Sequence, residues 1–165
     1  MAKAALILAL TLALPAAANA GTPSDSRVTL AAGACQTALP VFDGVVRKRP
    51  LAVQNEGTSI TFVTCGLEGR FNAEQATTRV FIGFVNNSSS QATVNCTLVD
   101  GRDSISDPVY MPKTVLLGAN TPMTEAAWTS VDNEGDNFIY PAISCSLPPG
   151  TGIKAVGQRF VTATP

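Results

Sequence analysis

The sequence contains no histidine. Histidine is the commonest metal ligand in proteins and the side chain most often used as a general base near neutral pH. Its absence excludes nucleophilic catalysis by a Ser-His-Asp or Cys-His arrangement. A Ser-Lys dyad is disfavoured too, because no lysine beyond residue 20 follows a serine by three positions, as an S-x-x-K motif requires. We therefore expect no cofactor and no enzymatic activity.

The sequence also lacks an excess of either charge. It has 11 Lys+Arg and 12 Asp+Glu, so its formal net charge is −1 at pH 7. Binding to nucleic acid or to an anionic membrane surface is typical of basic chains. Beyond residue 20, no apolar run approaches the length of about 20 residues that a membrane-spanning helix needs. We predict no nucleic-acid partner and no membrane span.

Residues 1–20 have the three-part layout of a secretory signal peptide. Lys3 supplies a positive charge, residues 4–14 form a short apolar run, and the small residues Ala18 and Ala20 form an A-x-A cleavage site. We expect cleavage near Ala20 and a protein that is secreted or periplasmic.

Four cysteines follow the predicted signal. They are Cys35, Cys65, Cys96 and Cys145. Disulfides are stable in the oxidising compartments to which a signal peptide leads. Four cysteines allow three pairings, which sequence alone does not decide, and we favour Cys35 with Cys65 and Cys96 with Cys145. A zinc site is disfavoured because it needs closely spaced pairs such as C-x2-C.

Strand patterns dominate the rest of the chain. Residues 59–65 alternate, with Ile60 and Phe62 on one face and Val63 and Cys65 on the other. Further strands are predicted at 78–85, 92–99, 109–117, 138–147 and 153–162, while 124–131 fits a strand or one helical turn. Short strands separated by Gly, Pro and Asn are typical of an antiparallel β-sandwich with Greek-key or jelly-roll order.

We therefore predict an all-β sandwich of seven to eight strands with two disulfides. Its domain organisation would be a signal peptide at 1–20, an N-terminal segment at 21–34 and a single domain at 35–163. The run NNSSS at 86–90 separates two of the strand patterns, and a polar loop of about five residues predicts a β-hairpin there.

Several short motifs resemble a known group of proteins. The opening segments are ACQ at 34–36, LP at 39–40, RKRPL at 47–51, NEG at 55–57 and FVTC at 62–65, and the closing segment is CSLPP at 145–149. They resemble small secreted four-cysteine proteins of gram-negative bacteria. The resemblance implies a secreted β-rich domain with two disulfides and unknown function, and it implies no catalytic residue.

One basic cluster stands out as a candidate ligand site. In an extended segment, Arg47 and Arg49 share a face and could together grip a carboxylate or a phosphate. The alternative that we favour is an edge strand protected from aggregation by its charges and by Pro50.

The aromatic residues offer a second candidate. Trp128, with Tyr110 and Tyr140, could form a sugar-stacking platform. Because Trp128 is the single tryptophan of the chain, a role in the core is the favoured alternative.

Two acidic groups complete the candidates. Asp132, Glu134 and Asp136 occupy positions typical of a calcium loop, although Gly135 and Ile143 depart from the EF-hand pattern, and a plain polar loop is favoured. A carboxylate-dependent glycoside hydrolase would need two acids to converge in one cleft. The candidates for that pair are Asp100, Asp103 and Asp107 together with the three acids of the loop.

These observations favour a non-enzymatic protein that binds a partner or has a structural role, with a cell-surface or carbohydrate partner. The alternatives are a pilus or fimbrial subunit or adhesin, and the glycoside hydrolase. A pilus subunit needs an apolar N-terminal donor strand. Residues 21–27 are too polar for one, so only residues 28–34 could serve.

Overall fold

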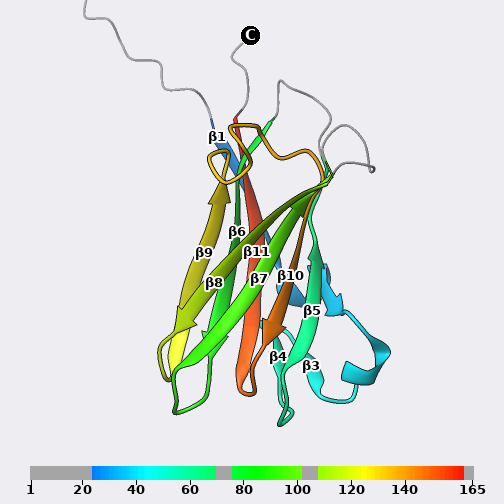
Figure 1. The fold of residues 1–165 in the computed structure, drawn as a ribbon. Coiled ribbons are helices and arrows are strands. Elements are labelled where there is room, and N and C mark those ends of the chain that lie inside the picture. The colour runs from blue at the N-terminus through cyan, green and yellow to red at the C-terminus, as the bar shows by residue number, and fades with distance from the viewer. Residues whose placement is uncertain (1–23, 70–75, 102–107, 162–165) are drawn as a thin grey trace, which may run out of the picture.

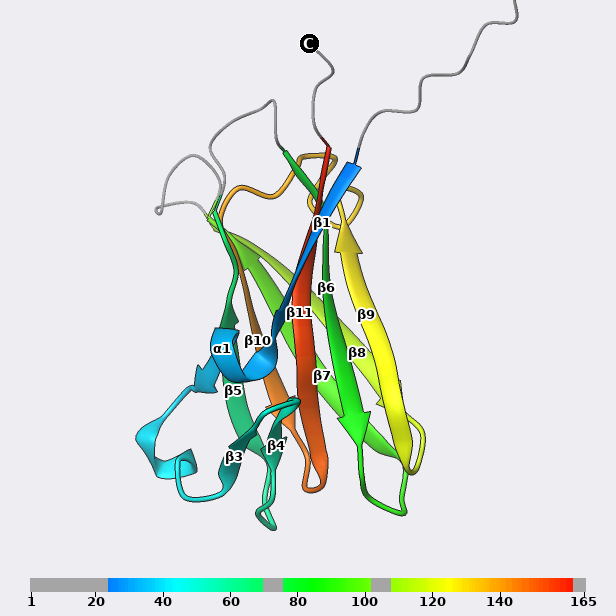
Figure 2. The same cartoon turned by 180° about the vertical axis from the view of Figure 1, so that it is seen from behind.

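The fold is a sandwich of two antiparallel β-sheets (Figure 1, Figure 2). The computed structural model describes residues 24–69, 76–101 and 108–161. Sheet A contains, in order, β3 (Val46–Arg49), β4 (Ala52–Asn55), β11 (Thr151–Val161), β6 (Thr77–Asn86) and β9 (Thr121–Thr129), and β1 (Ser24–Leu30) also pairs with β11. Sheet B contains β2 (Cys35–Thr37), β5 (Thr61–Gly66), β10 (Pro141–Leu147), β7 (Ala92–Asp100) and β8 (Val109–Leu117). Two short helices, α1 (Ala31–Ala34) and η1 (Pro40–Phe42), flank β2.

The strand order confirms the predicted sandwich and selects between the two predicted topologies. The strands β4-β11-β6-β9 face β5-β10-β7-β8, which is the order of a jelly roll. The described residues hold eleven strands, more than the seven to eight expected. The difference lies in the short strands between residues 24 and 55. The segment at 124–131, which fitted either a strand or a helical turn, belongs to strand β9.

The predicted hairpin between residues 78–85 and 92–99 is wrong. These segments are β6 and β7, which lie in different sheets. The buried side chain of Asn86 turns the chain from one sheet to the other. Its Nδ2 donates to the carbonyl oxygens of Ser90 and Gly118, both at 2.8 Å, and its Oδ1 accepts from the backbone N–H of Ser88 at 3.0 Å.

The crossing from β4 to β5 uses the same device. Asn55 is fully buried and donates to the carbonyl oxygens of Ser59 and Leu147, both at 2.8 Å, and accepts from the N–H of Gly57. A five-residue polar loop is thus compatible with a hairpin and with a sheet crossing, and the buried asparagine makes the crossing the stable solution here.

The core lies between the two sheets. Its largest fully buried side chains come from both sheets and from the loop before β10, and they include Trp128, Phe84, Phe138, Ile82, Leu98 and Ile143. Alternate residues of the strands of sheet B point inward, as the pattern at 59–65 predicted, with Thr61, Val63 and Cys65 buried. The opposite face of sheet B is therefore left to solvent.

Residues 24–30, which belong to the predicted N-terminal segment at 21–34, form a strand of sheet A. Ser24–Leu30 forms β1, which pairs with β11 along its whole length. All seven side chains of β1 are exposed, so its sequence shows no burial pattern. Backbone pairing with β11 holds this strand, and such pairing leaves no mark on side-chain composition.

Both disulfides have the pairing that we favoured. Cys35 bonds to Cys65 and Cys96 bonds to Cys145. In each pair the two cysteines are direct partners on neighbouring strands of sheet B. The first joins the short edge strand β2 to β5, and the second joins the inner strands β10 and β7. Among the described residues, no helix has the length and apolar character needed to cross a membrane.

Candidate functional site

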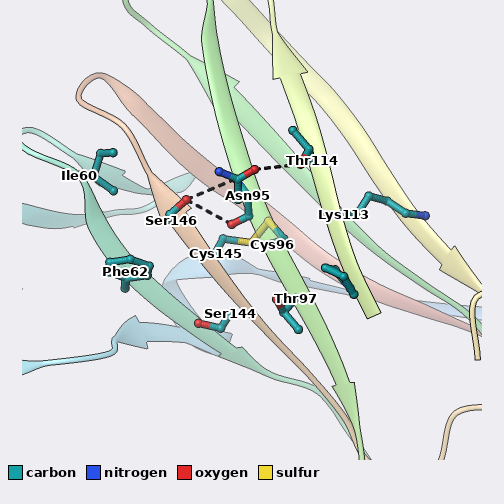
Figure 3. Close-up of a pocket in the computed structure, with 11 residues that line it drawn as sticks. Ile60, Phe62, Asn95, Cys96, Thr97, Lys113, Thr114, Ser144, Cys145 and Ser146 are labelled. Carbon is teal, nitrogen blue, oxygen red and sulfur yellow. Dashed lines mark hydrogen bonds between the residues drawn. A yellow bond between two sulfur atoms is a disulfide. The ribbon is translucent and has the colours of Figure 1, made fainter. Parts of the chain in front are cut away.

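A shallow groove of about 510 Å³ lies on the outer face of sheet B (Figure 3). Strands β5, β10, β7 and β8 form its floor and walls. Five of its eleven lining residues are small and polar, namely Ser144, Ser146, Asn95, Thr97 and Thr114. Ile60, Phe62 and Pro112 are apolar, and Cys96, Lys113 and Cys145 complete the lining.

The groove exists because strand β10 carries small residues on its outer face. Ala142, Ser144 and Ser146 alternate with the buried Ile143 and Cys145. The neighbouring strand β5 and the edge strand β8 carry bulkier outward side chains. A row of small side chains between two higher walls produces a trough, and the Cys96–Cys145 disulfide lies under its floor.

Hydrogen bonds tie the polar side chains of the groove to one another. Thr114 Oγ1 donates to Asn95 Oδ1 at 2.9 Å. Ser146 Oγ accepts from the backbone N–H of Asn95 and donates to its carbonyl oxygen, both at 3.3 Å. These contacts hold Asn95 in one orientation, as Figure 3 shows. A surface of fixed hydroxyl and amide groups can recognise a polar ligand at low entropic cost.

An apolar wall stands at the β5 side. Phe62 is 47% exposed and Ile60 is 54% exposed, so the two side chains form an adjacent apolar surface beside the polar side chains of the groove. The ring of Phe62 packs against the ring of Phe42, with the centroids 6.1 Å apart and the planes tilted by 44°. This contact supports the Phe62 side chain in its exposed position.

The charges near the groove are turned away from it. The ammonium group of Lys113 lies 2.5 Å from the carbonyl oxygen of Ala127, 3.3 Å from Asp132 Oδ1 and 5.3 Å from the centre of the Trp128 ring. It thereby closes the side of the sandwich between β8 and β9. The groove that remains is neutral.

Asp132 is held in its charged form. Burial alone would raise its pKa, but the backbone N–H of Thr129, the charge of Lys113 and side-chain hydrogen bonds from both residues outweigh that effect, so the pKa of Asp132 lies below its usual value of 3.8. The Thr129 N–H donates to Asp132 Oδ2 at 2.8 Å.

This lowered pKa predicts a pH-dependent part of the stability. A folded-state pKa below the unfolded one stabilises the protein above the unfolded value, and the contribution is lost as pH falls through the folded pKa. Because the Asp132 side chain is 33% exposed, we expect under about 1 kcal/mol. Urea denaturation should show the wild type losing its advantage over Asp132→Asn between about pH 5 and pH 2. A constant difference across that range would contradict this assignment.

The basic pair predicted from sequence lies elsewhere. Arg47 and Arg49 extend from β3, the edge strand of sheet A, and are exposed. Both point to Glu56, with Arg49 Nη2 2.5 Å from Glu56 Oε1 and Arg47 Nε 3.8 Å from Glu56 Oε2. The pair does grip a carboxylate, and that carboxylate belongs to the same chain. This arrangement favours the protected edge strand over a ligand site.

The three aromatic residues of the predicted platform are not brought together. Trp128 is fully buried, and its Nε1 donates to the carbonyl oxygen of Met111 at 2.9 Å. A buried ring cannot stack on a ligand, so the role of Trp128 as a ligand-binding residue is corrected to a role in the core. Tyr110 is 65% exposed on β8, and Tyr140 is half-buried against Gly69 and Gly101.

The acidic candidates do not converge either. The buried carboxylate of Asp100 is an acceptor for the N–H groups of Ile139 at 2.9 Å and Tyr140 at 2.7 Å, and for Asn133 Nδ2 at 3.1 Å. It fixes the loop before β10 and is not among the residues that line the groove. Asp103 and Asp107 lie outside the described residues.

Among the described residues, no set of metal ligands supports the hypothesis of a calcium site. Asp132 is bound to Thr129 and Lys113, whereas Glu134 and Asp136 are exposed on the turn that follows β9. In the part of the chain that the structure describes, no three His, Cys, Asp or Glu side chains gather as metal ligands.

Comparison with known proteins adds no evidence about the role of this chain. No protein-family model and no curated protein sequence matches the chain. Among solved structures, the chain is similar to the GH26-CBM35 β-(1,4)-mannanase of Podospora anserina, with 11% identity and a TM-score of 0.46, over 85% of this chain and 28% of that one. It is also similar to TmCBM61 in complex with β-1,4-galactotriose (11% identity, TM-score 0.42, 82% of this chain and 88% of that one) and to a CBM4 protein (15% identity, TM-score 0.34, 89% of each). The chain thus spans about a quarter of the mannanase. Scores this low carry no argument about what the chain binds.

Proposed function

We propose that this chain is an exported, non-catalytic binding module that holds a neutral carbohydrate in the groove of sheet B. The observation that carries the proposal is the composition of the groove. Its outward side chains are four hydroxyls, one amide, the ring of Pro112 and the exposed apolar wall of Ile60 and Phe62. Carbohydrates offer the matching chemistry, because they have many hydroxyl groups and an apolar C–H face that packs on an aromatic ring.

The neutrality of the groove favours a neutral ligand. Lys113 is among the lining residues, but its side chain points away from the groove (Figure 3), and its ammonium group is bound to Asp132 and to the carbonyl oxygen of Ala127. No carboxylate is among the lining residues of the groove. An anionic or cationic ligand would lose its hydration there without gaining an opposite charge.

The same composition argues for binding without catalysis. Glycoside hydrolysis uses two carboxyl groups that flank the scissile bond. Of the acids considered above, Asp100 is buried in a loop anchor and Asp132 is paired with Lys113. Neither reaches the groove.

The two disulfides support export. They suit an oxidising compartment, in agreement with the predicted signal at 1–20, which lies outside the described residues.

In the pilus alternative, residues 28–34 would serve as an apolar donor strand. Here Val28 and Leu30 are 61% and 51% exposed on β1, which pairs with β11 of its own chain.

The names of the similar structures agree with a carbohydrate ligand, since one is a complex with β-1,4-galactotriose. The proposal does not depend on them. It depends on the groove and is tested there.

The test is to fill the groove with a larger side chain and to measure glycan binding. We expect the protein to bind at least one neutral glycan on an array, and Ser144→Arg to weaken that binding at least about 10-fold, because an arginine side chain fills the trough between β5 and β7. Met123→Arg is the matched control, since Met123 is 52% exposed on β9 of the other sheet. Calorimetry gives the affinities and circular dichroism gives the melting temperatures.

Two results would contradict the proposal. One is an array on which only charged glycans, or none, are bound by the folded protein. The other is a Ser144→Arg variant that folds and binds like the wild type.

A further inference from the structure

The groove side chains form two straight rows that cross the strands. In the first row, Phe62 is the register partner of Ser146, Ser146 of Asn95, and Asn95 of Thr114. The second row contains Thr64, Ser144, Thr97 and Pro112, paired in the same way. Figure 3 shows parts of both rows side by side. The groups of the groove thus repeat once per strand.

The repeat distance of these rows is set by the sheet. Neighbouring strands lie about 4.8 Å apart, so the four residues of one row span about 14 Å. In a β-1,4-linked chain of glucose or mannose, both backbone bonds of each ring are equatorial, so the chain is an extended, flat ribbon whose repeat per sugar is close to that spacing. Such a ribbon can place one sugar over each step of the row, whereas a coiled α-linked chain leaves a flat row after one or two sugars.

The first row also has an order along its length. It begins at the supported ring of Phe62 and continues over Ser146, Asn95 and Thr114. Asn95 Oδ1 is engaged by Thr114, so the two N–H groups of its Nδ2 remain as donors to a ligand hydroxyl; no bond from Nδ2 is found within the described residues. The row therefore has one apolar end and a polar continuation.

We infer that the ligand is a linear, β-1,4-linked polymer of neutral hexoses, of the flat-ribbon type formed by glucose or mannose, that lies across the four strands of sheet B. One sugar packs its C–H face on Phe62, and the next sugars hydrogen-bond to Ser146, Asn95 and Thr114. This inference rests on the proposed function, and it adds the linkage, the direction of the chain and the length of the site.

The test uses oligosaccharides of defined length. Calorimetry is carried out on the full chain without its predicted signal, with β-1,4-linked glucose and mannose oligosaccharides of one to six sugars. For at least one of these series, we expect the affinity to rise at least about 10-fold from one sugar to three or four and then to level off, because the row spans about 14 Å. Maltotetraose, an α-linked chain of four sugars, should bind at least about 10-fold more weakly than the best β-linked tetramer.

Variants locate the ligand on the first row. Phe62→Ala and Asn95→Ala should each weaken tetramer binding about 5-fold to 20-fold, in line with the loss of an aromatic contact or a hydrogen bond. Met123→Ala removes an exposed apolar side chain from the opposite face and should leave binding unchanged. Tyr110→Ala, an exposed residue of β8 outside the groove lining, should also leave it unchanged. Phe42→Ala should weaken binding less than Phe62→Ala, because Phe42 only supports the ring.

The outcomes separate this inference from the proposed function. If no neutral saccharide binds in the groove, both are overturned. If neutral saccharides bind and Ser144→Arg blocks them, but one sugar binds as well as four, or maltotetraose binds as well as the β-linked tetramers, or Phe62→Ala has no effect, the carbohydrate module stands and the inference of a β-linked polymer across the strands is overturned.

Discussion

Replacing Asp100 by alanine is expected to lower the free energy of unfolding by about 3–5 kcal/mol. The substitution removes the acceptor for two backbone N–H groups, of Ile139 and Tyr140, and for the amide of the buried Asn133. Each of the two backbone donors left without a partner costs about 1–3 kcal/mol. Asn133 Nδ2 also loses its bond to Asp100 but keeps the carbonyl oxygens of Asp136 and Asn137 as acceptors. Urea denaturation followed by tryptophan fluorescence measures the change.

Two controls show whether hydrogen bonding is the cause. Asp100→Asn keeps one acceptor oxygen for the two backbone donors, so it should cost about half as much or less. Asp25→Ala removes an exposed carboxylate of β1 and should change stability by under about 0.5 kcal/mol. A loss below about 1 kcal/mol for Asp100→Ala would contradict the role of Asp100 as the anchor of this loop.

Removing the Cys96–Cys145 disulfide is expected to cost about 4 kcal/mol. The bond closes a loop of 49 residues, and in the chain-entropy model the cost grows with the logarithm of loop length. It also joins two inner strands of sheet B, so a Cys96→Ala/Cys145→Ala variant should unfold as a whole at lower urea concentration. The measurement is the denaturation midpoint under non-reducing conditions.

The other disulfide is the matched comparison. Cys35–Cys65 closes a loop of 30 residues, for which the same model gives about 3.6 kcal/mol. Because it ties down only the three-residue edge strand β2, we expect a smaller loss, as β2 can detach while the rest of the sandwich remains folded. Hydrogen exchange should show the local loss of protection. A larger loss for the edge disulfide than for the inner one would contradict this ranking.

The fold class was predictable because its signals are local. Alternation at residues 59–65, turn residues between strands and the spacing of four cysteines each point to a disulfide-bonded sandwich, and the structure agrees. Which sheet the chain enters after a loop depends on contacts between residues far apart in the sequence. Asn86 and the residues after it fit a hairpin turn, and only the carbonyl oxygen of Gly118, 32 positions away, completes the arrangement that sends β7 into the other sheet.

The candidate site was not predictable in the same way. Sequence reasoning selected residues that are chemically conspicuous, such as Arg49, Trp128 and Asp132, and the structure uses each of them internally. The groove consists of inconspicuous residues, and the register of four strands is needed to align positions 62, 146, 95 and 114. The one available signal was Phe62, a large apolar residue on the strand face opposite the buried Cys65.

The pairing of β1 with β11 has a consequence for how the protein is made. The first described strand is the partner of the last one, over seven residues from Ser24 to Leu30. A chain synthesised from its N-terminus cannot complete sheet A until residues 155–161 have emerged, because β11 is also the central partner of β4 and β6. Pairings between such distant segments form slowly. Topology alone therefore delays completion of sheet A until β11 has been synthesised, and until then the N-terminal strand β1 lacks its partner.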